Sequence, residues 1–239
     1  MAEVVWAQFR SPAGRLLERP VGQVRGERLE EREEVWRPAR HRGRRAIATW
    51  WRPAGQAGHV GCATLQALQA AVALEFDPQV AAFAGWPVRL GWAGSDQGYV
   101  PDFFVRLANG RARLVVCRSS GRAGAGWEET LRLLTAAGEQ AGWEVRVYAG
   151  SDSDVAARNR QRLSRYRHAR LADRDTAQTL HQAFARPRPF AEGVSASGLP
   201  ELATVARGLH LIWTRELAID WDAPFVPARS LVWSPREVL

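Results

Sequence analysis

Apolar positions in the middle of the chain follow the spacing of alternating helices and strands. The segment 63–74 is rich in alanine, leucine and glutamine, has Thr64 near its start and runs into Asp77-Pro78, so we expect a helix there. Short apolar runs bounded by turn residues follow it, with a hairpin signal at Asn109-Gly110. These runs predict short strands or turns over 80–90 and 99–107 and a strand over 112–117.

The next two segments complete a core of mixed type. Residues 128–141 predict a helix closed by Gly142, and 143–148 predict the strand that follows. The order helix, strand, hairpin, strand, helix, strand describes an α/β core in which the last strand runs parallel to its neighbour.

The pattern changes after Gly150, where polar and basic positions dominate. The stretch 158–170 holds six arginines in thirteen residues, and 172–185 predicts a helix. Proline, glycine and serine over 186–200 indicate a break. The segments 202–217 and 230–232 then predict a helix and a short strand of a small terminal module.

The first 45 residues are highly charged. Residues 25–34 mix both signs and predict a solvated surface segment, whereas 37–45 carry five arginines and no acid. That second run is a candidate for contacting phosphates, with a solvated arm as the alternative. The sequence therefore divides into a charged segment over 1–45, an α/β domain over 46–150 and an arginine-rich region over 151–239.

Composition narrows the classes of partner. The 239 residues include 33 basic and 25 acidic side chains, a net charge of +8, and every basic residue is arginine. Arginine binds phosphate through two parallel hydrogen bonds and stays charged, so nucleic acid is the leading partner class. No run approaches the about 18 apolar residues of a membrane span, and we expect a soluble cytoplasmic protein. Two cysteines, Cys62 and Cys117, exclude a disulfide framework or a cysteine zinc site.

The sharpest local pattern is Pro101-Asp102, which opens one predicted strand and is followed through the hairpin by a second strand that ends at Arg118. A metal-dependent nuclease of the PD-(D/E)xK type needs acids on adjacent strand ends that converge on Mg²⁺, and a cation beside them. The alternative is a turn with an exposed acid.

Four segments carry a resemblance that extends beyond this motif: 59–78, 101–106, 142–147 and 208–217. Together they resemble TnsA-like heteromeric transposase endonuclease subunits, in the same order over most of residues 45–235. The resemblance implies a restriction-endonuclease-like domain, with a mixed sheet flanked by helices, that cuts one strand at transposon ends. It also implies a small winged-helix-like C-terminal module and a DDE-type transposase as partner.

The chain departs from the family where the metal would bind. Ala63, Ala67 and Val116 stand where the family has acids, so that only Asp102 and Arg118 remain of the site. A lone carboxylate binds Mg²⁺ poorly, and an arginine is not a general base, although it can hold a phosphate.

Three interpretations follow from this loss. The first is a DNA-binding subunit that has lost catalysis and needs no cofactor. The second is an active Mg²⁺-dependent endonuclease that nicks transposon ends, with Asp102 as a metal ligand and a second acid recruited from Glu128, Glu129 or Glu144. The third is an assembly or regulatory subunit that uses the fold only for protein contacts.

The remaining candidates lie outside this site. The arginines of 158–170 are either DNA-binding residues or a solvated helix face; they are Arg158, Arg160, Arg162, Arg165, Arg167 and Arg170. Cys117 is either a nucleophile activated by Arg118 or a buried strand cysteine. His210 has apolar neighbours, which indicates a structural histidine rather than a ligand.

Overall fold

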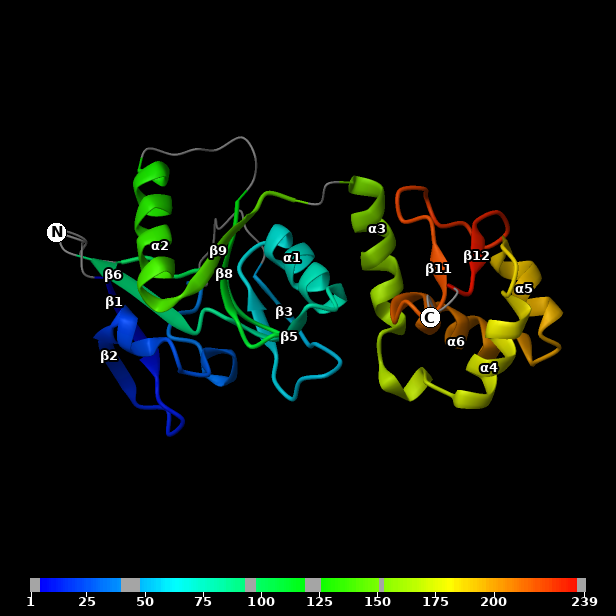
Figure 1. Cartoon of the computed structure of the whole chain (residues 1–239), viewed down its shortest axis with the longest axis horizontal. Helices are drawn as coiled ribbons and strands as arrows, with labels where there is room; N and C mark the ends of the chain where they lie inside the picture. The colour runs from blue at the N-terminus through cyan, green and yellow to red at the C-terminus, as the bar shows by residue number, and fades with distance from the viewer. Residues whose placement is uncertain (1–4, 40–47, 93–97, 119–125, 151–152, 236–239) are drawn as a thin grey trace. The chain divides into compact units, whose positions relative to one another are not determined.

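The computed structural model describes residues 5–39, 48–92, 98–118, 126–150 and 153–235 (Figure 1). The chain folds as two compact units, Met1–Gly150 and Ser151–Leu239. The protein is of mixed α/β type, with several sheets and helices. None of the helices within the described ranges combines the length and apolar composition needed to cross a membrane.

The first unit is built on a four-stranded mixed sheet in the order β5-β7-β8-β9. Its strands are β5 (Val80–Gly85), β7 (Phe103–Leu107), β8 (Ala112–Cys117) and β9 (Trp143–Tyr148). The first three pair antiparallel, and β9 runs parallel to β8 after the crossover through a helix. The predicted strands, the turn at Asn109-Gly110 and the parallel crossover are confirmed.

Helices α1 (Leu65–Phe76) and α2 (Trp127–Ala141) pack on opposite faces of this sheet. Alternation along β8 explains this, because successive side chains of a strand point to opposite faces. Leu114 and Val116 belong to a cluster with Leu134 of α2, whereas Val115 belongs to a second cluster with Ala70 of α1. Both predicted helices are confirmed, and Thr64 caps α1 by accepting a hydrogen bond from the Ala67 N–H at 3.0 Å.

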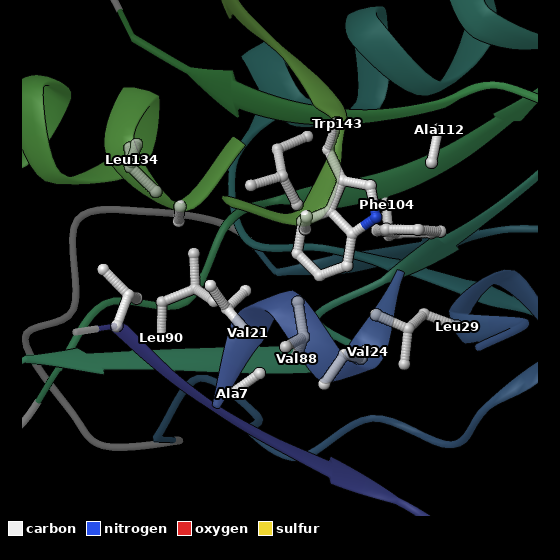
Figure 2. Close-up of a cluster of buried hydrophobic side chains, with 14 of the residues drawn as sticks. Ala7, Val21, Val24, Leu29, Val88, Leu90, Phe104, Ala112, Leu134 and Trp143 are labelled. Atoms are coloured by element: carbon white, nitrogen blue, oxygen red, sulfur yellow. The ribbon is translucent and has the colours of Figure 1, made fainter. Parts of the chain in front are cut away.

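The charged N-terminal segment belongs to the fold of the first unit. It contains β1 (Val5–Arg10), β2 (Leu16–Pro20), η1 (Val21–Val24) and η2 (Leu29–Glu31), and β1 also pairs with β6 (Val88–Trp92). A further pair of strands, β3 (Thr49–Trp51) and β4 (Val60–Cys62), lies between this segment and α1 in the sequence. Figure 2 shows side chains from this segment and from β6 packed with Leu134, Phe104 and Trp143 in one hydrophobic cluster.

The expectation of a solvated segment over 25–34 is therefore wrong in part: five of its ten residues are exposed, but its centre is buried. Leu29 is fully buried, and Glu30 is only 6% exposed. The Glu30 carboxylate accepts two hydrogen bonds at 3.1 Å from Arg106 of β7, which also donates to the Glu27 carbonyl. Charged residues in this segment pair with one another and with the sheet, an arrangement that a count of charges along the sequence does not reveal.

The second unit combines helices with a small antiparallel sheet of order β10-β12-β11. Its elements are α3 (Asp154–Leu163), η3 (Ser164–Tyr166), η4 (Ala169–Leu171), α4 (Arg174–Ala183), β10 (Arg188–Pro189), α5 (Phe190–Ala196), α6 (Glu201–Trp213), β11 (Ala218–Ile219) and β12 (Leu231–Trp233). The predicted helices over 172–185 and 202–217 correspond to α4 and α6.

The predicted break over 186–200 is wrong in part, because it contains β10 and α5. Pro189 precedes the first residue of α5, a position where proline is tolerated, and Phe190 and Val194 are buried one turn apart. Burial of this face stabilises a seven-residue helix that its composition alone would not maintain.

We expect Gly138→Ala to destabilise the first unit, although the same change stabilises an open helix by about 1 kcal/mol. A Cβ atom on Gly138 would lie 2.7 Å from the Trp143 carbonyl oxygen and 2.9 Å from Val145 Cγ2, so α2 must move away from β9. Urea unfolding should show a loss of about 1–3 kcal/mol. The control Gly26→Ala has no heavy atom within 4 Å and should change stability by less than about 1 kcal/mol. A more stable Gly138→Ala variant would contradict this packing.

Candidate functional site

Asp102 lies at the start of β7, where that strand meets the end of β8. Its Oδ2 atom accepts a hydrogen bond from the Cys117 backbone N–H at 2.7 Å, and its carbonyl oxygen accepts one from the Trp86 N–H at 3.2 Å. The carboxylate is thus fixed by the backbone of the neighbouring strand.

Burial changes the acidity of this carboxyl group. Loss of water raises the pKa of Asp102 from 3.8 to about 6, and the backbone N–H groups of Cys117 and of Asp102 itself oppose the shift only in part. Burial thus disfavours the ionised form of the Asp102 side chain, and a nearby cation or metal ion would stabilise that form.

Three other titratable side chains surround Asp102. Burial, with the charge of Asp102 as the next largest cause, raises the pKa of the Cys62 thiol to about 12 and raises the pKa of Cys117 and of Tyr99 further above their ordinary values. Both thiols are therefore protonated at neutral pH. This favours the buried strand cysteine over the nucleophile for Cys117, because a thiol attacks as its thiolate.

Arg118 lies next to this group, as the resemblance implies. Its guanidinium carbon is 4.0 Å from the ring centre of Trp127 at the start of α2, and its backbone N–H donates to the Tyr148 carbonyl at 2.9 Å. The positive charge of Arg118 lowers the pKa of Tyr99 while that of Asp102 raises it, so both charges act on one phenol. The structure therefore places Asp102 and Arg118, the two residues singled out from the sequence, in one region around Tyr99.

The three positions for which the resemblance implies acids carry no side-chain ligand. Ala67 is buried against the α1 face of the sheet, and Val116 is buried in the cluster on the α2 face. Ala63 precedes the Thr64 cap of α1. Within the described ranges, no three or more histidine, cysteine, aspartate or glutamate side chains form a group that could hold a metal ion.

Glu75, the first acid of α1, has a structural role at the far end of the helix. Its carboxylate accepts hydrogen bonds from Trp51 Nε1 at 2.6 Å and from the Ala54 N–H at 2.7 Å.

Glu144 is not placed to complete the site. It pairs with Arg113 in the register of β8 and β9, whereas Cys117 pairs with Tyr148. Four residues of strand, about 13 Å, separate these two levels. The Glu144 carboxylate binds Arg113 at 2.8 Å and Arg111 at 3.0 Å, and the hydrogen bond from Arg113 lowers its pKa. The remaining candidates, Glu128 and Glu129, are exposed in the first turn of α2, which also holds Trp127.

Gln66 is a residue of this region that the sequence did not single out. Its Nε2 atom donates to the Tyr148 carbonyl at 3.3 Å, the same oxygen that accepts from the Arg118 N–H. The sequence feature that could have identified Gln66 is its position as a polar residue in the first turn of α1, close to Ala63 and Ala67. Gln66 links α1 to the strand ends with a neutral amide, which supplies no negative charge for a divalent cation.

Four arginines of 158–170 are exposed, Arg158, Arg162, Arg165 and Arg170, whereas Arg160 and Arg167 are partly buried. Arg162 and Arg167 donate through Nη1 to the backbone carbonyls of Phe225 and Ser164, at 3.1 Å and 2.7 Å.

The second basic run, over 37–45, is described only at its start. Arg37 pairs with Glu34 and lies over the Trp50 ring. The arginines and the histidine of 40–45 lie outside the described residues.

His210 has the structural role expected from its apolar neighbours. It is buried in α6, and its Nδ1 atom donates to the Tyr166 carbonyl at 2.6 Å.

No family model matches the chain, and no curated protein matches it. The function is therefore inferred from the geometry of each unit.

We expect Asp102→Asn to stabilise the protein relative to the native chain as the pH rises. The pKa of Asp102 is raised on folding, so its contribution to stability is present below about pH 4 and is lost as the pH rises through about 6. Asparagine cannot ionise, yet its side-chain oxygen can still accept from Cys117. The unfolding free energy of the variant minus that of the native chain should therefore increase by about 2–3 kcal/mol between pH 4 and pH 7.5 in urea titrations.

The matched control for this measurement is Glu139→Gln, which changes an exposed acid of α2. Its difference from the native chain should stay constant over the same pH range. An Asp102→Asn difference that also stays constant would contradict the buried carboxyl group.

Proposed function

We propose that this chain is a TnsA-like transposase subunit that binds DNA and whose nuclease-like unit has lost metal-dependent cleavage. The observation that carries the proposal is the chemistry around Asp102. Within the described part of the chain, one carboxylate, a neutral glutamine and protonated thiols occupy the place that a nuclease fills with several acids.

The architecture of the first unit supports the nuclease-like part of the proposal. A mixed sheet is flanked by α1 and α2, and Asp102 and Arg118 lie at the meeting ends of β7 and β8. This is the arrangement that the resemblance implies for a restriction-endonuclease-like domain.

The order of elements in the second unit supports a winged-helix-like module. Helices α5 and α6 are joined by the four residues 197–200, which include Gly198 with a positive φ, as in a helix-turn-helix pair. The strands β11 and β12 follow, separated by the loop 220–230, and pair with β10 in one small sheet.

The loss of catalysis follows from ligand chemistry. Mg²⁺ keeps its water shell unless several oxygen ligands or substrate phosphates hold it, and Asp102 supplies only one carboxylate. Arg118 cannot act as a general base, because a guanidinium does not lose its proton in a protein. Arg118 can still hold a DNA phosphate near the strand ends.

Binding of DNA is supported by the charge of +8, all of its positive side chains being arginine. A subunit that binds without cutting needs another protein to carry the strand cleavage. We therefore propose a DDE-type transposase as its partner.

We expect the native chain to bind a DNA duplex and to leave supercoiled plasmid intact in Mg²⁺ or Mn²⁺. Asp102→Asn should bind the duplex within about 2-fold of the native affinity, because the lost charge does not contact a metal. Binding by fluorescence anisotropy and nicking on agarose gels measure the two properties separately.

Two results would contradict the proposal. Metal-dependent nicking that disappears in Asp102→Asn would identify an active endonuclease. Failure of the native chain to bind any duplex would instead favour a subunit that makes only protein contacts.

A further inference from the structure

Helix α6 occupies the position of the recognition helix in the proposed winged-helix-like module, but its surroundings do not suit that role. In a helix-turn-helix protein the second helix lies in the major groove, and its N-terminal residues contact the base edges. A helix that reads DNA in this way must therefore be open and polar at least over its N-terminal part.

The C-terminal half of α6 is enclosed on every side. The six consecutive residues 208–213 are all buried. Since a helix completes a turn in about 3.6 residues, a buried run of this length leaves no open face. Helices α4 and α5 pack on α6, and so do α3, η3 and η4, with His210 bonded to the Tyr166 carbonyl of η3.

The N-terminal half of α6 is open but carries the wrong chemistry for DNA. Its exposed side chains are Glu201, Leu202 at 90% exposure and Ala203, an acid and two apolar groups. Arg207 donates to Thr176 at 2.8 Å and lies 3.5 Å from the Asp173 carboxylate. The loop 220–230 begins with two acids, Asp220 and Asp222.

The segment that packs on α6 has the opposite character. Residues 155–172 contain six arginines and no acid. Four of these arginines are exposed, and Arg162 among them is bound to the Phe225 carbonyl. We call the other three exposed side chains, those of Arg158, Arg165 and Arg170, the arginine ridge. They lie on three successive elements, α3, η3 and η4, so no single helix presents them to a groove.

The ridge is anchored to the rest of the second unit. Asn159 of α3, next to Arg158 in the sequence, is buried; it donates to the carbonyls of Trp221 and Ala223 and accepts from the Phe225 N–H. Arg162 adds a bond to the Phe225 carbonyl. These bonds hold α3 in place, which reduces the entropy lost when its arginines meet a ligand.

We propose that the second unit binds duplex DNA through phosphates at the arginine ridge, outside helix α6, and therefore without reading base sequence. The inference rests on the proposed function, because it presumes that the chain binds DNA. It assigns any choice of DNA site to the partner or to the first unit.

The test is fluorescence anisotropy of the full chain on two duplexes of equal length and unrelated sequence, over a range of salt concentrations. The ridge variant replaces Arg158, Arg165 and Arg170 by glutamine. The control variant makes the same change at three other exposed arginines of the second unit, Arg174, Arg186 and Arg229. A third variant, Leu202→Glu, places a negative charge on the open end of α6 without disturbing its core.

Each phosphate contact contributes about 0.9 to the slope of log K against log salt. The ridge variant should therefore lose on the order of 100-fold in affinity at about 0.15 M salt, and its slope should fall by about 3, equally on both duplexes. The control variant and Leu202→Glu should each stay within about 3-fold of the native affinity.

Different failures have different meanings. If the native chain binds neither duplex, the proposed function fails, and the inference fails with it. If the chain binds but the ridge and control variants behave alike, only the inference fails. A loss in Leu202→Glu confined to one of the duplexes would show that α6 reads bases and would overturn it. A ridge variant that keeps its DNA affinity but loses the partner transposase would assign the ridge to a protein.

Discussion

The hydrogen bond from the Cys117 backbone N–H to Asp102 Oδ2 fixes the point at which β7 and β8 come together, and the chemistry of the first unit depends on it. The bond holds a carboxyl group in a setting that disfavours its charge. In a metallonuclease, further acids and a divalent cation would offset that burial. Among the residues that the structure describes, this region holds an amide, two protonated thiols and a guanidinium stacked on Trp127. The proposed function follows from this set, because it supplies little of the negative charge that a metal ion requires.

In the second unit, the exposed basic side chains lie outside helix α6. The C-terminal half of α6 is buried, in part by the segment that carries the arginines, and its open N-terminal half has no exposed arginine. The buried Asn159 is central to this arrangement, because its three hydrogen bonds tie α3 to the loop 220–230.

The sequence predicts the central sheet and both of its helices well, since local signals determine them. Thr64 caps α1, Gly142 closes α2 in a left-handed conformation, and the apolar run of β8 has the predicted bounds. It fails where long-range pairing decides the structure. Glu30 looks like a surface acid until Arg106, distant in sequence, is placed beside it. The short helix α5 depends on burial of Phe190 and Val194, which composition does not reveal.

The candidate site, too, was predicted from the sequence only in part. The motif correctly paired Asp102 with the end of β8, because two strands joined by a hairpin must be adjacent. It did not identify Gln66, whose role depends on how α1 packs, and it left Glu144 open as a recruited acid. The strand register excludes Glu144 by placing it at the level of Arg113.

The proposed loss of the metal site is tested most directly by calorimetric titration of Mn²⁺ into the protein with a short duplex present, beside Asp102→Asn. We expect that neither protein gives a metal-binding isotherm, although both bind the duplex. Saturable Mn²⁺ binding by the native chain that is absent from Asp102→Asn would contradict it, because a working metal site would then exist at Asp102.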